Sequence, residues 1–266
     1  MEKYDVKFKK KFGQNFLKDI NIVKRIVDVS GVNEKSLVIE VGPGGGVMTK
    51  ELASRAKNVL AYEIDHDLED ELYKRLDGFD NVDILFQDFL TSDLVSDVSN
   101  YNYDELYFVS NVPYYITTPI LMKIIESGLD FNKIVIMVQK EVGDRFSTAP
   151  GNREYGSITV LLNYFYNVKK EFNVSRKQFI PEPNVDSLIV SFSPKEEKIE
   201  LKDYNHFEKL IRDSFQFKRK TLRNNLKNYD LKVIEEVLKE YGYDLTVRAE
   251  NLSTEIFAKI SNALRK

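Results

Sequence analysis

The stretch EVGPGGGVMT, residues 40–49, decides the fold, because it joins a continuous apolar run to a segment with helical spacing. The apolar run LVIEVG (37–42) predicts a buried strand, and residues 47–56 predict the helix that follows it. Glycine has no Cβ, so a ligand can approach the backbone closely at the amino terminus of that helix. We therefore expect a ligand-binding turn between this strand and this helix.

Outward from this loop, the chain alternates between strand-like and helix-like patterns as far as residue 139. The further predicted strands are NVLAYEID (58–65), VDILFQD (82–88), LYFVSN (106–111) and KIVIMVQ (133–139). This alternation is typical of an α/β protein with a mostly parallel sheet and helices on both faces. After about residue 198, apolar residues recur at helical spacing, which predicts a small all-helical domain. We therefore expect two domains, residues 1–198 and 199–266.

The glycine spacing excludes one common ligand of such loops. The dinucleotide fingerprint G-x-G-x-x-G/A fails, because its third position is Val47 counted from Gly42 and Thr49 counted from Gly44. What remains is a G-x-G-x-G pattern at Gly42, Gly44 and Gly46. This pattern resembles the loop that binds S-adenosyl-L-methionine in class I methyltransferases, which have a Rossmann-like fold. The resemblance implies that cofactor, with Gly42 and Gly44 among its contacts.

Polar side chains lie at the carboxyl ends of the next predicted strands. Glu63 ends the second strand, 21 residues after Gly42, where a carboxylate can accept hydrogen bonds from both hydroxyls of a ribose. Asp88 ends the third strand and could accept a bond from an adenine amino group, and Asn111 ends the fourth. Because open α/β sheets bind ligands at the carboxyl ends of their strands, we expect these residues to share one site. For Asp65, by contrast, we expect a helix-capping role.

The segment SNVPYYIT (110–117) follows the fourth strand and suggests a reaction. An adenine N6 amino group is a poor nucleophile, because its lone pair is delocalised into the ring. Two hydrogen-bond acceptors for its hydrogens would turn the lone pair toward a methyl sulfonium. Asn111 offers a side-chain carbonyl, and Pro113 keeps Val112 extended so that the Val112 carbonyl can project into the site. Tyr114 offers a flat face on which a flipped-out base can stack, although a plain proline turn with a buried tyrosine would give the same motif.

Composition narrows the class of protein further. The 266 residues contain 42% hydrophobic and 30% charged residues and no apolar run long enough for a membrane span. The amino terminus is too charged for a secretory signal, so we expect a cytoplasmic protein. Cysteine is absent and only two histidines occur, which leaves almost no material for a metal site or a histidine-based catalytic triad.

Basic residues are concentrated near both ends of a chain whose formal net charge is −3. Residues 1–25 hold eight Lys or Arg against three Asp or Glu, and residues 216–227 hold five basic residues and no acidic one. Such runs fit either a solvated face or a local nucleic-acid footprint. The candidate RNA-binding residues are Lys10, Lys11, Lys218, Arg219, Lys220 and Arg223.

Motifs along nearly the whole chain resemble the KsgA/RsmA family of small-subunit (16S) rRNA adenine N6-dimethyltransferases. These motifs are KKFGQNFL (10–17), VIEVGPGGGVMT (38–49), YEID (62–65), QDFL (87–90), NVPYYITTPI (111–120), QKEVGDRF (139–146), YGSITVL (155–161), FIPEPNVDS (179–187) and KRKTLRNNL (218–226). The family fold implies a Rossmann-like methyltransferase domain followed by a helical carboxyl-terminal domain.

The resemblance also implies a reaction and a set of site residues. The reaction transfers four methyl groups from S-adenosylmethionine, two to each of two adjacent adenines in a hairpin near the 3′ end of small-subunit rRNA. The implied partner is an assembling small ribosomal subunit, and we expect a monomer. The family's cofactor contacts fall on Asn15, Leu17, Gly42, Glu63, Asp88 and Asn111. The aromatic residues that hold the target base fall on Tyr114 and Phe179.

Three alternatives remain open. An Erm-type enzyme would dimethylate one adenine of large-subunit rRNA, but its glycine loop usually reads more like G-S-G-K-G, whereas this loop has Pro43. A non-catalytic RNA-binding assembly factor could keep the fold, although intact Glu63 and Asn111 argue against lost catalysis. A dinucleotide oxidoreductase is disfavoured by the failed fingerprint.

Overall fold

A computed structural model describes residues 15–265, and these residues form two compact units. The first unit contains residues 15–143 and Lys169–Pro194, and the second contains Asp144–Val168 and residues 195–265. The division after Pro194 lies close to the boundary expected after residue 198, but residues 144–168 join the helical unit. They do so because the helix Ser157–Phe165 packs on the later helices, with the ring of Tyr164 5.0 Å from the ring of Phe207.

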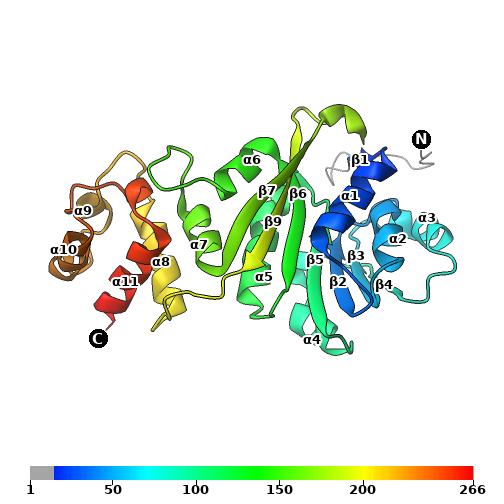
Figure 1. Ribbon diagram of the computed structural model, residues 1–266, viewed down its shortest axis with the longest axis horizontal. Coiled ribbons are helices and arrows are strands. Elements are labelled where there is room, and N and C mark those ends of the chain that lie inside the picture. The colour runs from blue at the N-terminus through cyan, green and yellow to red at the C-terminus, as the bar shows by residue number, and fades with distance from the viewer. Residues whose placement is uncertain (1–14, 266) are drawn as a thin grey trace. The chain divides into compact units, whose positions relative to one another are not determined.

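The first unit is organised around a sheet that contains seven strands of the described chain, in the order β4-β3-β2-β5-β6-β9-β7 (Figure 1). The strands from β4 to β6 run parallel, and β9 runs antiparallel to β6 with Ile136 opposite Val190. A separate short pair joins β1 to β8. The strands are β1 (Phe16–Leu17), β2 (Ser36–Val41), β3 (Asn58–Tyr62), β4 (Val82–Leu85), β5 (Glu105–Ser110), β6 (Lys133–Gln139), β7 (Tyr166–Val174), β8 (Phe179–Ile180) and β9 (Ser187–Pro194).

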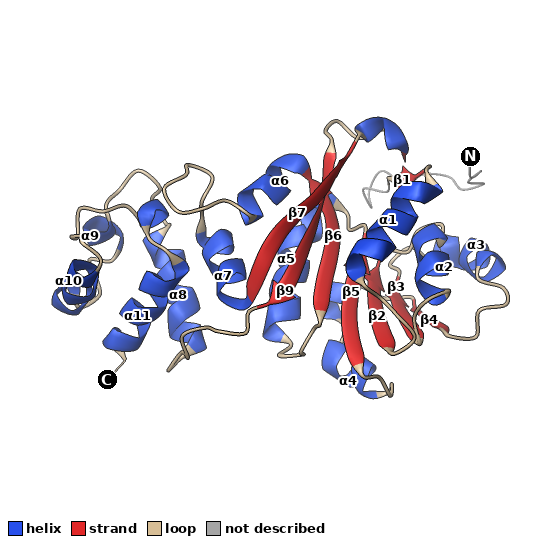
Figure 2. Ribbon diagram, in the orientation of Figure 1, coloured by secondary structure: helices blue, strands red, loops and turns tan. Residues whose placement is uncertain are grey.

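Helices cover both faces of this sheet (Figure 2). On one face, α1 and α2 bury Ile26 and Leu52 against Val38 of β2 and Val109 of β5. On the other face, Phe89 packs edge-on against Tyr62, and Lys123 of α5 lies over the Phe89 ring. The helices of this unit are α1 (Ile20–Ser30), α2 (Val47–Ala53), α3 (Glu69–Arg75), α4 (Leu94–Ser99), α5 (Thr117–Glu126) and α6 (Lys140–Phe146), which ends just inside the second unit.

The five strands predicted from the sequence are all present, and the mostly parallel α/β architecture is confirmed. Two strands that were not predicted, β7 and β9, extend the sheet at its antiparallel edge. The residues 188–192, LIVSF, are a short apolar run like those of the parallel strands, and the direction of a strand depends on the chain that connects it.

The second unit is helical apart from the first residues of β7. Its helices are α7 (Ser157–Phe165), α8 (Tyr204–Ser214), α9 (Leu222–Asn225), α10 (Leu231–Glu240) and α11 (Thr254–Leu264). Their apolar faces meet in a core in which Phe207, Ile234 and Phe257 are completely buried. Within residues 15–265, no helix has the length and apolar character that crossing a membrane requires.

Candidate active site

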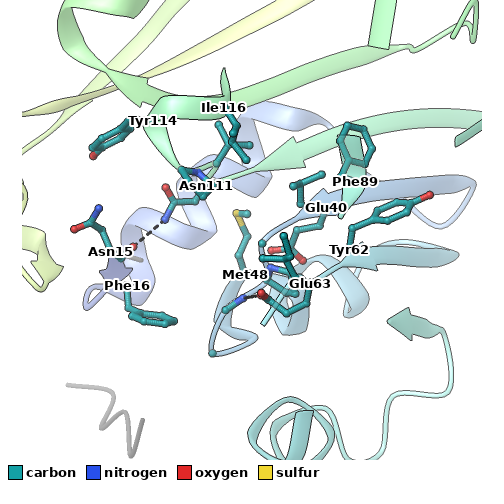
Figure 3. Close-up of a pocket in the computed structure, with 18 of the residues that line it drawn as sticks. Asn15, Phe16, Glu40, Met48, Tyr62, Glu63, Phe89, Asn111, Tyr114 and Ile116 are labelled. Carbon is teal, nitrogen blue, oxygen red and sulfur yellow. Dashed lines mark hydrogen bonds between the residues drawn. The ribbon is translucent and has the colours of Figure 1, made fainter. Parts of the chain in front are cut away.

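A cavity of about 320 Å³ lies in the first unit, where the carboxyl ends of β2, β3 and β5 meet the segment that follows β4. Four parallel strands bring their carboxyl ends to the same edge of the sheet, so the residues that follow them converge there. Figure 3 shows Asn15 and Tyr114 at one end of this pocket and Glu40 and Glu63 at the other. The sequence-predicted residues that line it are Asn15, Leu17, Gly42, Gly44, Glu63, Asp88, Asn111, Val112 and Tyr114.

The glycine loop between β2 and α2 needs its glycines for two physical reasons. Gly44 has a φ of 57°, a left-handed conformation that other residues rarely adopt. A Cβ placed on Gly44 would also lie 2.6 Å from Cε1 of Phe16, which is closer than real Cβ atoms come. The loop and β1 therefore approach each other at van der Waals distance, and this approach closes one side of the pocket.

Glu63 lies directly after β3, and only 4% of its surface is exposed. Its Oε2 accepts a hydrogen bond from the Gly44 amide at 3.1 Å, and its Oε1 accepts one from the Asp65 amide at 2.9 Å. Burial raises the pKa of this carboxyl, and the two backbone donors partly oppose that rise. The carboxylate is thus held at the pocket wall and tied directly to the glycine loop.

Glu40 is a pocket residue that the sequence analysis did not single out. It lies inside β2 with no exposed surface, and neither of its carboxyl oxygens has a hydrogen-bond partner of ordinary geometry among the described residues. Burial raises its pKa to about 8, although the neighbouring Thr49 hydroxyl favours the anion to some degree. Glu40 is therefore mostly protonated at neutral pH. The available signal was an acidic residue inside the continuous apolar run 37–42.

The two aspartates near the strand ends have local capping roles. Asp88 accepts a hydrogen bond from the Leu90 amide at 2.9 Å and so caps the short 3₁₀ turn Phe89–Thr91. Asp65 accepts from the Asp67 amide at 3.3 Å at the start of the turn His66–Leu68, which confirms its expected capping role. Asp88 differs from Asp65 because it also lines the pocket.

The amide of Asn111 is oriented by a residue 96 positions earlier in the chain. Its Nδ2 donates a hydrogen bond to the backbone carbonyl of Asn15 at 3.2 Å (Figure 3). Because only the NH₂ end of an amide can donate to a carbonyl, the Oδ1 end is left as an acceptor at the pocket. The Val112 carbonyl also has no hydrogen-bond partner among the described residues, and Val112 lines the same cavity.

Tyr114 is held at the pocket by its hydroxyl, which lies 2.7 Å from Oγ of Ser187 in β9. Burial raises the pKa of this phenol, so it stays neutral near neutral pH. The next residue, Tyr115, also lines the pocket but is 65% exposed. The two tyrosines therefore differ in environment: one ring is fixed by β9, and the other faces solvent.

The position of Phe179 does not support the role expected from its motif. Its side chain is only 1% exposed, it belongs to the core cluster, and it is not among the residues that line the pocket. Phe179 pairs with Leu17 in the β1–β8 ladder. The Phe179 ring therefore packs in the apolar core of the first unit, and its role in holding the base stays a prediction.

The predicted RNA-binding residues lie apart from this cavity in the sequence. Lys10 and Lys11 lie outside the described residues. Lys218, Arg219, Lys220 and Arg223 belong to the second unit, on and before α9, and all four side chains are exposed. In the part of the chain that the structure describes, no group of three or more His, Asp or Glu side chains is arranged to hold a metal ion.

Comparison with protein families matches nearly the whole chain to one model. The model is described as ribosomal RNA adenine dimethylase and matches residues 5–266. The ribosomal RNA small subunit methyltransferase A of Streptococcus pneumoniae (strain P1031) is 43% identical over 274 residues, which cover 100% of this chain and 94% of that protein. The protein of the same name from Macrococcus caseolyticus (strain JCSC5402) is 41% identical and is matched over 93% of its length, with 100% of this chain covered.

Two solved structures share both units of the fold. A dimethyladenosine transferase from Plasmodium falciparum has a TM-score of 0.78 and 28% identity, over 92% of this chain and 95% of that chain. The 23S rRNA methyltransferase ErmE has a TM-score of 0.72 and 26% identity, over 94% of this chain and 100% of that chain. The relatives with the higher identity are thus named for the small subunit, whereas one of the two structural neighbours is named for 23S rRNA.

Proposed function

This chain belongs to the ribosomal RNA adenine dimethylase family, and we propose that it dimethylates N6 of two adjacent adenines near the 3′ end of small-subunit rRNA. The observation that carries the proposal is the orientation of Asn111, whose amide oxygen is left free at the pocket by the bond from its nitrogen to Asn15. The product is dimethyladenosine in a hairpin of the rRNA, made during ribosome biogenesis.

The family uses S-adenosylmethionine, and the pocket residues fit that cofactor. Glu40 leaves two buried oxygens without partners at the pocket wall, which fits a polar ligand that forms hydrogen bonds there. Glu63 would accept hydrogen bonds from ribose hydroxyls, and Asp88 would accept one from an adenine amino group. The backbone of the glycine loop, Asn15 and Leu17 would complete the binding wall. When bound, the cofactor supplies an electrophilic methyl group.

The chain's own contribution to the reaction is to hold the target amino group. The Asn111 Oδ1 and the Val112 carbonyl would each accept a hydrogen bond from one N–H of the N6 amino group. These two bonds would withdraw the nitrogen lone pair from the ring and keep it aimed at the methyl group. No general base is required, because the proton can leave after the methyl group has been transferred. After the first methyl transfer only one N–H remains on N6. Dimethylation therefore requires that one of the two acceptors give up its hydrogen bond.

Tyr114 would hold the flipped-out adenine by stacking. Stacking of a base on an aromatic ring contributes roughly 1–3 kcal/mol, and it uses the face of the ring. The hydrogen bond between the Tyr114 hydroxyl and Ser187 fixes the ring from its edge and leaves stacking to the ring face. Phe179 would support this arrangement indirectly, through the packing of β1.

The substrate is an rRNA, and we further propose that it is recognised within an assembling small subunit in the cytoplasm, by a monomer of this chain. Four exposed basic residues of the second unit, Lys218, Arg219, Lys220 and Arg223, would contact phosphates. The Erm-type alternative is not favoured, because the relatives that are 41–43% identical are named for the small subunit.

The decisive experiment is incubation of the protein with labelled S-adenosylmethionine and small subunits that lack these methyl groups. We expect label in dimethyladenosine, mapped by mass spectrometry to two adjacent adenines near the 3′ end of the rRNA. Parallel reactions should contain large-subunit rRNA and the Asn111→Ala variant. Label in the large-subunit rRNA alone would refute the substrate, and no label in any RNA would refute the activity.

A further inference from the structure

Phe217 is an aromatic residue on the surface of the second unit, in the loop between α8 and α9. It is 56% exposed, and it directly precedes the exposed residues Lys218, Arg219 and Lys220. A single exposed apolar ring is common on protein surfaces, so the residues around it decide whether it can serve as a binding residue. The catalytic pocket described above makes no use of it.

The backbone of this loop is held in place by hydrogen bonds. The Phe217 carbonyl accepts from the Lys220 amide at 2.9 Å and from the Asn225 Nδ2 at 3.4 Å. The same Asn225 nitrogen donates to the Ser214 carbonyl at 2.6 Å. The loop therefore presents the Phe217 ring from a backbone fixed on both sides, which reduces the entropy lost when the ring binds a partner.

Phe215, two residues earlier in the same segment, differs from Phe217 because its ring packs against other aromatic rings of this unit. Its ring packs against Tyr155 at 6.2 Å and against Phe257 at 5.9 Å between ring centroids. Phe215 thus ties the loop to the helical core, and no ring contact of this kind involves Phe217 among the described residues. The Phe215 ring therefore anchors the loop, whereas the Phe217 ring is available to bind a partner.

The charge around Phe217 indicates the chemistry of that partner. Within residues 15–265, Lys218, Arg219, Lys220 and Arg223 form no salt bridge. The acidic residues of neighbouring α8 are already paired, as in the bond between Lys209 and Asp213 at 2.6 Å. The pKa of the exposed Asp244 is lowered mainly by hydrogen bonds from Thr246, and the charge of Arg223 adds a smaller contribution. The cluster therefore favours a partner that is anionic.

We propose that Phe217 stacks on an unpaired base of the rRNA while the basic side chains beside it bind the flanking phosphates. Single-stranded RNA alternates flat bases with charged phosphates, and this matches a fixed aromatic ring placed among unpaired cations. The inference rests on the proposed function and adds to it a binding residue far in sequence from the catalytic pocket. The basic residues supply attraction that salt weakens, and Phe217 supplies a contact that salt hardly affects.

The test measures the affinity of each variant for small subunits that lack the methyl groups, over a range of salt concentrations. Phe217→Ala should bind roughly 5- to 100-fold more weakly, with the slope of affinity against salt unchanged. Phe217→Trp and Phe217→Tyr should bind like the wild type, whereas Phe217→Leu should bind as weakly as the alanine variant, because leucine is apolar but has no ring face. All should keep the wild-type melting temperature, because the ring is exposed.

Tyr73 provides a matched control, because it is also 56% exposed but lies on α3 of the first unit. Tyr73→Ala should leave binding unchanged. Wild-type affinity of Phe217→Ala, or full rescue by leucine, would overturn the stacking proposal. Methylation by the wild-type protein is measured in the same preparations, so its absence would refute the proposed function separately from the role of Phe217.

A photocrosslinking amino acid at position 217 identifies the partner directly. In the complex with small subunits, a crosslink to rRNA supports the proposal. Crosslinks to ribosomal protein alone would overturn it, because the ring would then cover a protein surface.

Discussion

The pocket of the first unit and the basic loop between α8 and α9 of the second unit place charge in opposite environments. In the pocket, Glu40 and Glu63 are 0% and 4% exposed, and their protonation and orientation depend on individual neighbours. In the loop, Lys218 and Arg219 are exposed and unpaired among the described residues. Charges excluded from water interact strongly at short range, whereas exposed charges act weakly and are screened by salt.

This difference predicts how the two regions respond to substitution. Single changes in the pocket should have large effects that salt hardly alters. Neutralising a single charge in the loop should have a small effect that salt removes.

The largest expected effect concerns Glu40 and the pH dependence of stability. The pKa of Glu40 is about 8 in the folded protein against 4.5 for an ordinary glutamate, so the folded state keeps a proton that the unfolded state releases. Its contribution to stability is complete below pH 4.5 and is lost as the pH rises through about 8. Glu40→Gln cannot ionise. As the pH rises from 4.5 to about 8, its free energy of unfolding should therefore increase by roughly 3–5 kcal/mol relative to that of the wild type.

Chemical denaturation of both proteins at several pH values measures this difference. All other titrating groups are present in both proteins, so their contributions cancel in the difference between the two free energies of unfolding. A stability difference that is constant with pH would show that the Glu40 carboxyl is not protonated in the folded protein.

The next effect concerns the rate of methyl transfer. Asn111→Ala removes the proposed acceptor for the amino group, so the single-turnover rate should fall by roughly 100-fold. Asn111→Asp keeps two acceptor oxygens but cannot donate to the Asn15 carbonyl. Its single-turnover rate should therefore lie between those of Asn111→Ala and the wild type. Mass spectrometry of the RNA separates the first transfer from the second. Wild-type rates for both transfers in Asn111→Ala would reduce the motif to a proline turn.

Cofactor affinity should depend on Glu63. Glu63→Ala removes the proposed acceptor for the ribose hydroxyls and also the partner of the Gly44 amide, so cofactor binding should weaken by about 1.5–3 kcal/mol. Glu63→Gln keeps one acceptor oxygen, so its affinity for S-adenosylmethionine should fall by less. Isothermal titration calorimetry with S-adenosylmethionine measures both, at low and high salt. An unchanged affinity in Glu63→Ala would remove this residue from the cofactor site.

The smallest expected effect is a single neutralisation in the loop. Lys218→Gln should weaken subunit binding severalfold at low salt and reduce the slope of log affinity against log salt by about 1 or less. Lys232→Gln, an exposed lysine on α10, is the matched control in the same unit. Cofactor affinity should not change in either variant. Equal slopes for both variants would mean that the loop is only a solvated face.

Much of the site could be predicted from the sequence, because it depends on local rules. The five parallel strands follow from their apolar runs, and their carboxyl ends place Gly42, Glu63, Asp88 and Asn111 at one pocket. Glu40 was missed because an acid inside an apolar run gives no sign of which neighbours it will have. Phe179 was assigned to the base from its motif, whereas its ring lies in the buried core cluster of the first unit.

The sequence by itself determined the alternation of strands and helices from β2 to β6, the glycines of the loop and the bend at Pro113, because these depend on backbone sterics and on residues a few positions apart. Only the tertiary structure decided the direction of the Asn111 amide, which depends on Asn15, 96 positions earlier. It also decided the protonation of Glu40 and the different exposure of Phe215 and Phe217. Burial and hydrogen-bond partners belong to the packed chain, and residues far apart in the sequence supply them.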